Sequence, residues 1–283
     1  MSRKLSLKST WRHGTLTLAE FAEKTIGLLE DLRRLHPAFN RLNAADLVRM
    51  RDLPVPEDLS GFADPLMNIA WDRQVSHAFE PMNPRDESPL PESTNVDGYQ
   101  VSFYSAPPED RYPRSVRVIL RAGMDNNPIA NVCTLVFGEL EPFTLTGFQR
   151  ELLIAVMAHW PVDASTLTSF PFSKQVHGSD PELHKRDRPP PLNIGWLTYV
   201  RRAGLVEALP PGTKAEPFGE PPGVLITLDG DRFEPDNPEQ MAQALEIREA
   251  LRAANLLANP AETPSAEIDR ATTRPLRENR RRE

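Results

Sequence analysis

The chain has very little of the chemistry from which covalent cross-links are built. Its 283 residues include one cysteine, Cys133, so an intrachain disulfide is impossible and nothing requires an oxidising compartment. Cys133 lies in the apolar run 131–137, where we expect a buried, unreactive thiol. Glycine is also scarce, with 14 residues against 29 prolines. That ratio indicates many ordered loops and a rigid, irregular surface.

Long apolar segments are missing as well. No apolar run approaches the roughly 18 residues that a membrane-spanning helix needs. The N-terminal segment 1–7 has the basic start of a signal peptide, but polar and charged residues such as Lys8 and Arg12 interrupt the apolar stretch that should follow. The sequence therefore predicts a soluble, cytoplasmic protein that does not bind membranes.

The sequence motifs of common active sites are absent. We find no Gly-x-Ser-x-Gly elbow and no phosphate-binding loop of the Walker or Rossmann type. His177 and His184 flank several carboxylates, but the spacing is poor for zinc and the stretch contains a proline, so a solvated loop is favoured. These absences predict a protein that is not an enzyme and uses no catalytic residue, metal or cofactor.

The segment 229–236 concentrates negative charge in one short loop. It resembles a calcium loop only loosely, because its glycine is at the second position and Gln240 replaces the chelating glutamate. The sequence favours an exposed acidic turn before a helix N-terminus, where the helix dipole stabilises negative charge. An acidic contact patch is the alternative, and its carboxylates are Asp229, Asp231, Glu234 and Asp236.

Several segments carry the periodicity of helices. Thr17 and Glu20 form the pattern of a capping box before an amphipathic helix over 18–35. Further helices are predicted over 64–77, over 146–160 with Gln149 at the capping-box position, and from Asn237 onward. The prolines between 161 and 192 instead indicate a long irregular excursion.

Strand patterns occupy the middle of the chain. The runs 99–104, 115–121 and 132–137 are separated by short connections, which favour antiparallel pairing. Two more strands are predicted over 193–200 and 223–228, and Gly195 indicates a bulge or a close backbone approach. The order predicts an α+β fold, with a mostly antiparallel sheet and flanking helices in a single main domain over residues 1–257. The Arg-rich segment 258–283 is expected to be a disordered tail.

The net charge of −7 is unevenly distributed along the chain. Residues 1–42 contain 8 basic and 4 acidic side chains, and residues 258–283 contain 6 and 5, which leaves 19 basic and 31 acidic side chains in residues 43–257. A body with a net charge of −12 repels nucleic acid and favours a basic macromolecular partner. A general contribution to solubility is the alternative explanation.

The segment Asn193-Ile194-Gly195-Trp196-Leu197-Thr198-Tyr199 resembles the Gly-Trp-Leu/Met-Thr-Tyr segment of the immunity protein 52 family of polymorphic toxin systems. A second segment is also similar to that family: the leucines Leu28, Leu29, Leu32 and Leu35, followed by His36-Pro37 and Phe39. The resemblance implies a protein that binds and neutralises a toxin with a restriction-endonuclease-like domain, of which several are delivered by type VI secretion. The resemblance covers most of residues 15–257. Within it, we expect Trp196 and Tyr199 to be core residues.

The acidic loop 229–236 is the first candidate for contact with such a toxin, because nuclease inhibition needs a surface complementary to a basic groove and no catalytic group. A Pro-rich loop that contains Asp86, Glu87 and Glu92 is the second candidate. Two alternatives stay open. One is a small metal-dependent hydrolytic enzyme built on Asp229, Asp231, His177 and His184, and the other is an adaptor subunit of a secretion system.

Overall fold

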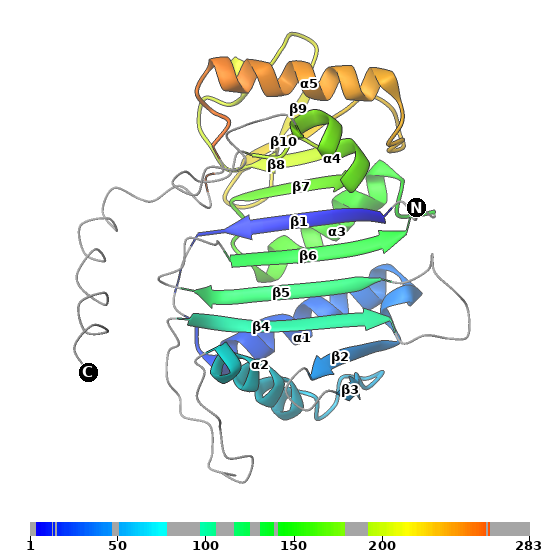
Figure 1. The fold of residues 1–283 in the computed structure, drawn as a ribbon, viewed down its shortest axis with the longest axis vertical. Helices are drawn as coiled ribbons and strands as arrows, with labels where there is room; N and C mark the ends of the chain where they lie inside the picture. Colours follow the sequence, from blue (N-terminus) through cyan, green and yellow to red (C-terminus); the bar gives the residue numbers. More distant parts are fainter. Residues whose placement is uncertain are drawn as a thin grey trace, which may run out of the picture.

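A single ten-stranded antiparallel sheet organises the chain, in the order β3-β2-β4-β5-β6-β1-β7-β8-β10-β9 (Figure 1). The computed structural model describes residues 4–12, 14, 16–46, 51–77, 97–105, 116–124, 131–138, 141–178, 192–258 and 260. The strands are β1 (Lys4–Trp11), β2 (Leu42–Asp46), β3 (Arg51–Pro54), β4 (Asp97–Ser105), β5 (Arg117–Met124), β6 (Asn131–Gly138), β7 (Ala164–Ser169), β8 (Leu197–Val200), β9 (Lys214–Phe218) and β10 (Gly223–Thr227).

The helices lie on both faces of this sheet. They are α1 (Leu18–Leu35), α2 (Ala63–His77), α3 (Thr146–His159), α4 (Phe170–His177) and α5 (Pro238–Ala253), with short 3-10 turns at Pro37–Phe39 and Val206–Ala208. Helix α1 packs between α2 and α3 on one face, and α4 packs against α5 on the other face (Figure 1). The predicted α+β class with flanking helices is confirmed.

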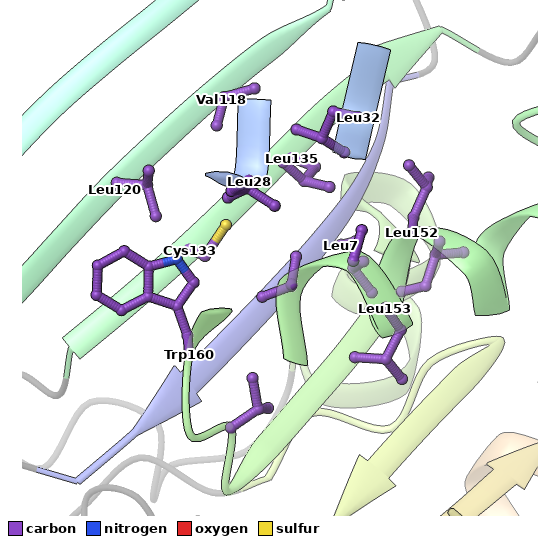
Figure 2. Packing of buried hydrophobic residues seen from close by; sticks show 14 of the residues in the cluster. Leu7, Leu28, Leu32, Val118, Leu120, Cys133, Leu135, Leu152, Leu153 and Trp160 are labelled. Atoms are coloured by element: carbon purple, nitrogen blue, oxygen red, sulfur yellow. The ribbon is translucent and has the colours of Figure 1, made fainter. Parts of the chain in front are cut away.

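Helices α1, α2 and α3 bury one side of the central strands β1, β4, β5 and β6. In β4, β5 and β6 alternate residues are fully or almost fully buried, as the two-residue period of a strand requires. Figure 2 shows the centre of this core, where leucines of α1 and α3 meet the side chains of β1, β5 and β6. Its labelled members are Leu7, Leu28, Leu32, Val118, Leu120, Cys133, Leu135, Leu152, Leu153 and Trp160.

Helix α1 forms where the sequence predicts it, and for the predicted reason. The Thr17 Oγ1 accepts from the Glu20 backbone N–H at 3.2 Å, and the Glu20 carboxylate accepts from the Thr17 backbone N–H at 2.8 Å. These bonds satisfy two donors that a helix N-terminus would otherwise leave unpaired. The helix ends at Leu35, just before Pro37.

The N-terminal strand β1 and the strand β7 have no counterpart in the sequence prediction. β1 lies at the centre of the sheet between β6 and β7, and β7 with α4 occupies part of the stretch 161–192 that the prolines predict to be irregular. All six residues of β7 are buried, which means that neither side of the strand faces solvent. Its sequence Ala-Ser-Thr-Leu-Thr-Ser therefore lacks the alternation of apolar and polar residues that marks a half-buried strand. Its hydroxyls bond to distant partners instead: Ser9 Oγ lies 2.8 Å from Ser165 Oγ.

Two further details differ from the sequence prediction. Gln149 is buried and does not cap α3; its Nε2 donates to the Phe143 carbonyl at 2.8 Å. The strand predicted over 193–200 begins only at Leu197. Cys133 is buried as predicted, and burial raises the pKa of its thiol far above the usual range.

Candidate functional site

The predicted acidic loop lies between the end of β10 and the start of α5, and its four carboxylates are exposed. Phe233 anchors the loop, because its ring is buried and lies 5.9 Å from the Trp196 ring and 5.3 Å from the Phe172 ring. The apolar anchor leaves the acidic residues on either side of it, Asp231 and Glu234, facing solvent.

Gln240 holds the backbone of the acidic loop in place. Its Oε1 accepts from the Glu234 N–H at 3.1 Å, and its Nε2 donates to the carbonyls of Asp229 and Arg232, each at 3.1 Å. Gln240 is only 4% exposed, so water competes little with these bonds. Asn237 caps α5 by accepting from the N–H groups of Glu239 and Gln240.

The start of α3 supports the other side of the loop. The Phe233 N–H donates to the Thr144 carbonyl, and the Thr146 N–H donates to the Asp231 carbonyl, both at 3.0 Å. Between these segments lies a shallow groove of about 710 Å³. The groove is lined by Thr144, Arg232, Phe233, Glu234, Pro235, Asp236, Asn237, Pro238 and Glu239.

The carboxylates of the loop differ in their electrostatic surroundings. Asp229 Oδ1 lies 3.0 Å from Lys214 Nζ, so much of its charge is compensated within the protein. Glu234 accepts from Asn237 Nδ2 at 3.0 Å, and this neutral amide does not cancel its charge. Within the part of the chain that the structure describes, Asp231 forms no ion pair. The charges of Asp231 and Glu234 are therefore less compensated by neighbouring cations than the charge of Asp229.

The remaining predicted site residues do not join this loop. His177 is buried and not in a solvated loop, because its Nε2 accepts from the Ile194 N–H at 3.0 Å while Arg248 Nε lies 3.2 Å from its Nδ1. His184, Asp86, Glu87 and Glu92 lie outside the described residues.

A shared metal site between His177 and the acidic loop finds no support in the geometry. Asp229 contacts Gln243, and His177 contacts Arg248. Gln243 and Arg248 are five residues apart on α5, which corresponds to about 7.5 Å along the helix axis. Metal ligands must lie within about 2.5 Å of one ion. Among the described residues no group of three or more histidine, cysteine, aspartate or glutamate side chains could hold a metal ion.

The segment around Trp196 supports the loop from beneath. Trp196 and Tyr199 are fully buried, which confirms their prediction as core residues. Gly195 makes the close backbone approach that its sequence position indicates, since a Cβ built there would lie 2.2 Å from the Leu167 carbonyl oxygen. Trp196 also lies beneath Gly230, whose φ of +111° suits glycine at this turn.

The sequence located the acidic loop but not the residues that shape it. In the sequence, Gln240 stands out only as the residue in place of the chelating glutamate of a calcium loop. Its contacts with Asp229, Arg232 and Glu234 depend on the folded path of the loop. Phe233 offers one signal: it is the one aromatic residue among the carboxylates of segment 229–236, and phenylalanine is usually buried.

The geometry can be compared with known proteins. The solved structure of the Pseudomonas aeruginosa T6SS protein PA0821 superposes with a TM-score of 0.52 at 10% sequence identity, covering 95% of this chain and 84% of that one. That similarity concerns the fold alone. A search of the curated proteins finds no match. No described helix has both the length and the apolar character needed to span a membrane.

The family comparison covers nearly the whole chain. The profile of the family named Immunity protein 52 matches residues 9–260, which include all ten strands except the first residues of β1, all five helices, the Trp196 segment and the acidic loop. The sequence resemblance is thereby confirmed. The chain belongs to the immunity protein 52 family.

Proposed function

We propose that this protein neutralises a cognate nuclease-type toxin by stoichiometric binding, in the cytoplasm of the cell that makes it. Membership of the immunity protein 52 family supports a toxin as the partner. Nothing in the proposed mechanism requires the protein to catalyse a reaction; it needs only to cover the toxin's active surface and to dissociate slowly.

The observation that carries the proposal is the rigid, exposed acidic loop 229–236. Its backbone is held by Gln240 and by the start of α3, so little conformational entropy is lost when it binds. Its carboxylates beside a groove of about 710 Å³ offer a complement to the basic surface with which a nuclease binds nucleic acid. The segment containing Asp86, Glu87 and Glu92 is a second candidate contact.

The test is a pull-down and a co-expression rescue with a candidate nuclease-type toxin, chosen from the genes that neighbour the gene of this chain. The double substitution Asp231→Arg, Glu234→Arg should weaken binding by about 100-fold or more, because it replaces attraction by repulsion at the contact. Protection of cells that express the toxin should be lost in parallel.

The matched control is Glu23→Arg with Glu151→Arg. Both residues are exposed, on α1 and α3, and the change in net charge is the same. This control should bind and protect like the unaltered protein. Equal affinity of both variants for the toxin would rule out the acidic loop as the contact, and a failure of the unaltered protein to bind would refute the proposed function itself.

A further inference from the structure

Part of the sheet has one face that no described helix covers. Helices α1, α2 and α3 pack on one side, while α4 and α5 lie on the other side over β7 and its neighbours (Figure 1). Over β4, β5, β6 and β1 the second side therefore stays open in the described part of the chain. We call this region the open face. Its exposed and half-buried side chains include those of Lys4, Lys8, Tyr104, Arg117, Ile119 and Arg121, whereas Thr10 and Ser102 on the same side are buried.

The open face has a charge opposite to that of the protein as a whole. Four of its side chains are cations, Lys4, Lys8, Arg117 and Arg121, and the carboxylate at its edge is Asp52 of β3, which is hydrogen-bonded to Tyr104. The chain as a whole contains 40 acidic and 33 basic residues. A random selection of surface positions from such a chain would contain more acids than bases. The open face is thus a local positive region on a negative molecule, which attracts acidic groups.

The cations surround a small apolar centre. The strand register places Arg117 opposite Val136, Arg121 opposite Val132 and Lys8 opposite Thr134, and Ile119 lies in the same row as Thr134. Ile119, Val132 and Val136 are half-buried, whereas Lys8 and Arg117 are exposed. An apolar centre inside a charged rim is the usual arrangement of a protein–protein interface.

An exposed aromatic residue lies beside this face. Phe170, the first residue of α4, is 78% exposed. It directly follows Ser169, which pairs with Leu5 of β1, so it lies next to the end of β1 that begins with Lys4. Large aromatic side chains are enriched among the residues that dominate binding energy in interfaces.

The size of the region sets the kind of contact it can make. Four strands at about 4.8 Å spacing and about 20 Å of strand length give an area of roughly 400 Å². A standard interface buries about 800 Å² on each partner. The open face alone therefore suits a moderate contact, and Phe170 with the surface of α4 would extend it.

We propose that the open face, together with Phe170, binds an acidic protein surface that presents apolar side chains among its carboxylates. This contact goes beyond the proposed function, because it lies on other elements than the acidic loop and has the opposite charge. A single-stranded nucleic acid fits less well, since among these described positions only Tyr104 and Phe170 are aromatic and the net charge of −7 repels a polyanion.

The test uses two labelled probes and needs no toxin. The first is an 18-residue peptide with two glutamates and one leucine in each repeat of three, and the second is an oligothymidylate of equal charge. Fluorescence anisotropy at low salt should detect peptide binding by the unaltered protein. The triple substitution Lys8→Glu, Arg117→Glu, Arg121→Glu should weaken peptide binding at least tenfold. If that variant does not fold, the matching glutamine substitutions at the three positions replace it.

Two matched controls separate the open face from general charge and hydrophobicity. The first control carries the substitutions Arg34→Glu, Arg41→Glu and Arg252→Glu, at exposed cations outside the open face. It changes the net charge by the same amount as the triple variant and should leave peptide binding unchanged. Phe170→Ala should weaken peptide binding, whereas Ile154→Ala, at a residue that is 53% exposed on α3, should not.

The proposal is overturned if the unaltered protein does not bind the peptide, if the triple variant binds as well as the unaltered protein, or if the oligothymidylate binds more tightly than the peptide. None of these outcomes bears on the toxin assay of Asp231 and Glu234, so either proposal can fail while the other stands.

Discussion

At the residue scale, Gly195 determines where the Trp196 segment can lie. A Cβ atom at this position would stand 2.2 Å from the Leu167 carbonyl oxygen and 2.7 Å from Thr166 Cγ2. The backbone of residues 192–196 therefore runs directly against β7, with the Thr166 hydroxyl donating to the Asn193 carbonyl at 2.7 Å. Trp196 then reaches the Phe233 ring that anchors the acidic loop.

We expect Gly195→Ala to destabilise the protein by about 2–3 kcal/mol, because the added methyl group meets fixed backbone and forces β7 and β8 apart. Thermal unfolding should show a melting temperature lower by about 5 °C or more. Gly147→Ala is the control, since nothing lies within 4 Å of the position that its methyl group would take in the first turn of α3. Gly147→Ala should leave stability unchanged or raise it by up to about 1 kcal/mol; equal effects of both substitutions would contradict the close approach.

Tyr104 gives stability a dependence on alkaline pH. Burial, followed by the hydrogen bond and the negative charge of Asp52, raises the pKa of its phenol to about 12. In the unfolded chain a tyrosine has a pKa of about 10. The folded state therefore keeps the proton that the unfolded state loses, and the associated stability is present below pH 10 and is lost as pH rises from about 10 to about 12.

We expect the melting temperature of Tyr104→Phe to fall less steeply between about pH 10 and pH 12 than that of the unaltered protein. Asp52→Asn should have a smaller effect in the same direction, because it removes the carboxylate but leaves the phenol partly buried. Identical slopes for all three proteins, measured by thermal unfolding across this pH range, would show that Tyr104 does not account for the dependence.

At the scale of elements, α1 illustrates a helix whose limits come from local chemistry. The Thr17 and Glu20 side chains each bond to the backbone of the other residue, and the Thr17 hydroxyl also donates to the Glu20 carboxylate at 2.8 Å. These interactions, the Thr17 hydrogen bonds foremost, lower the pKa of Glu20. Every contact lies within four residues of sequence, which is why a sequence pattern alone predicts this helix start.

We expect Thr17→Ala to lower the free energy of unfolding by about 1 kcal/mol through loss of the N-cap. The double substitution Thr17→Ala, Glu20→Ala should cost less than the sum of the single substitutions, because both remove the same reciprocal bonds. Chemical denaturation of the four proteins measures this coupling. Strict additivity would mean that the two side chains act independently.

Strand β7 shows the opposite case at the same scale. Its hydroxyls bond to Ser9 on β1 and to Asn193 before β8, residues that are 156 and 27 positions away. A strand buried on both faces loses the alternation by which half-buried strands are recognised. Pro161 and Pro171 on either side of β7, together with its polar composition, point to a loop. Only the neighbouring strands and α4 make it a central strand.

At the scale of the whole molecule, the position of β1 unites the sheet. β1 pairs with β6 on one side and with β7 on the other, so the N-terminal strand joins the β4–β5–β6 meander to the C-terminal strands. The described contacts also extend past residue 257, since Arg202 donates to the Ala258 carbonyl and Arg12 to the Pro260 carbonyl. The boundary between the domain and a disordered tail at 257 stays a prediction.

The two charged surfaces of the molecule lie at different positions along the sheet. The acidic loop follows β10 near one end of the strand order, whereas the open face spans β4 to β1 nearer the middle. Charge counts along the chain indicate an acidic body with a net charge of −12 over residues 43–257, in which the positive surface cannot be seen. The positive surface arises because Lys8 on β1 and Arg117 and Arg121 on β5, more than 100 residues apart, point to one side of the same sheet.

By itself the sequence determined the features that depend on local interactions. These are the helix starts at Thr17 and Asn237, the three-strand meander, the burial of Cys133 and Trp196, the α+β class and the exposed acidic loop, because capping, periodicity and turn chemistry act over a few residues. The tertiary structure decided the rest. The central place of β1, the burial of β7, the support of the acidic loop by Gln240 and the cations of the open face all depend on which distant strands pair, and short-range patterns carry no information about that pairing.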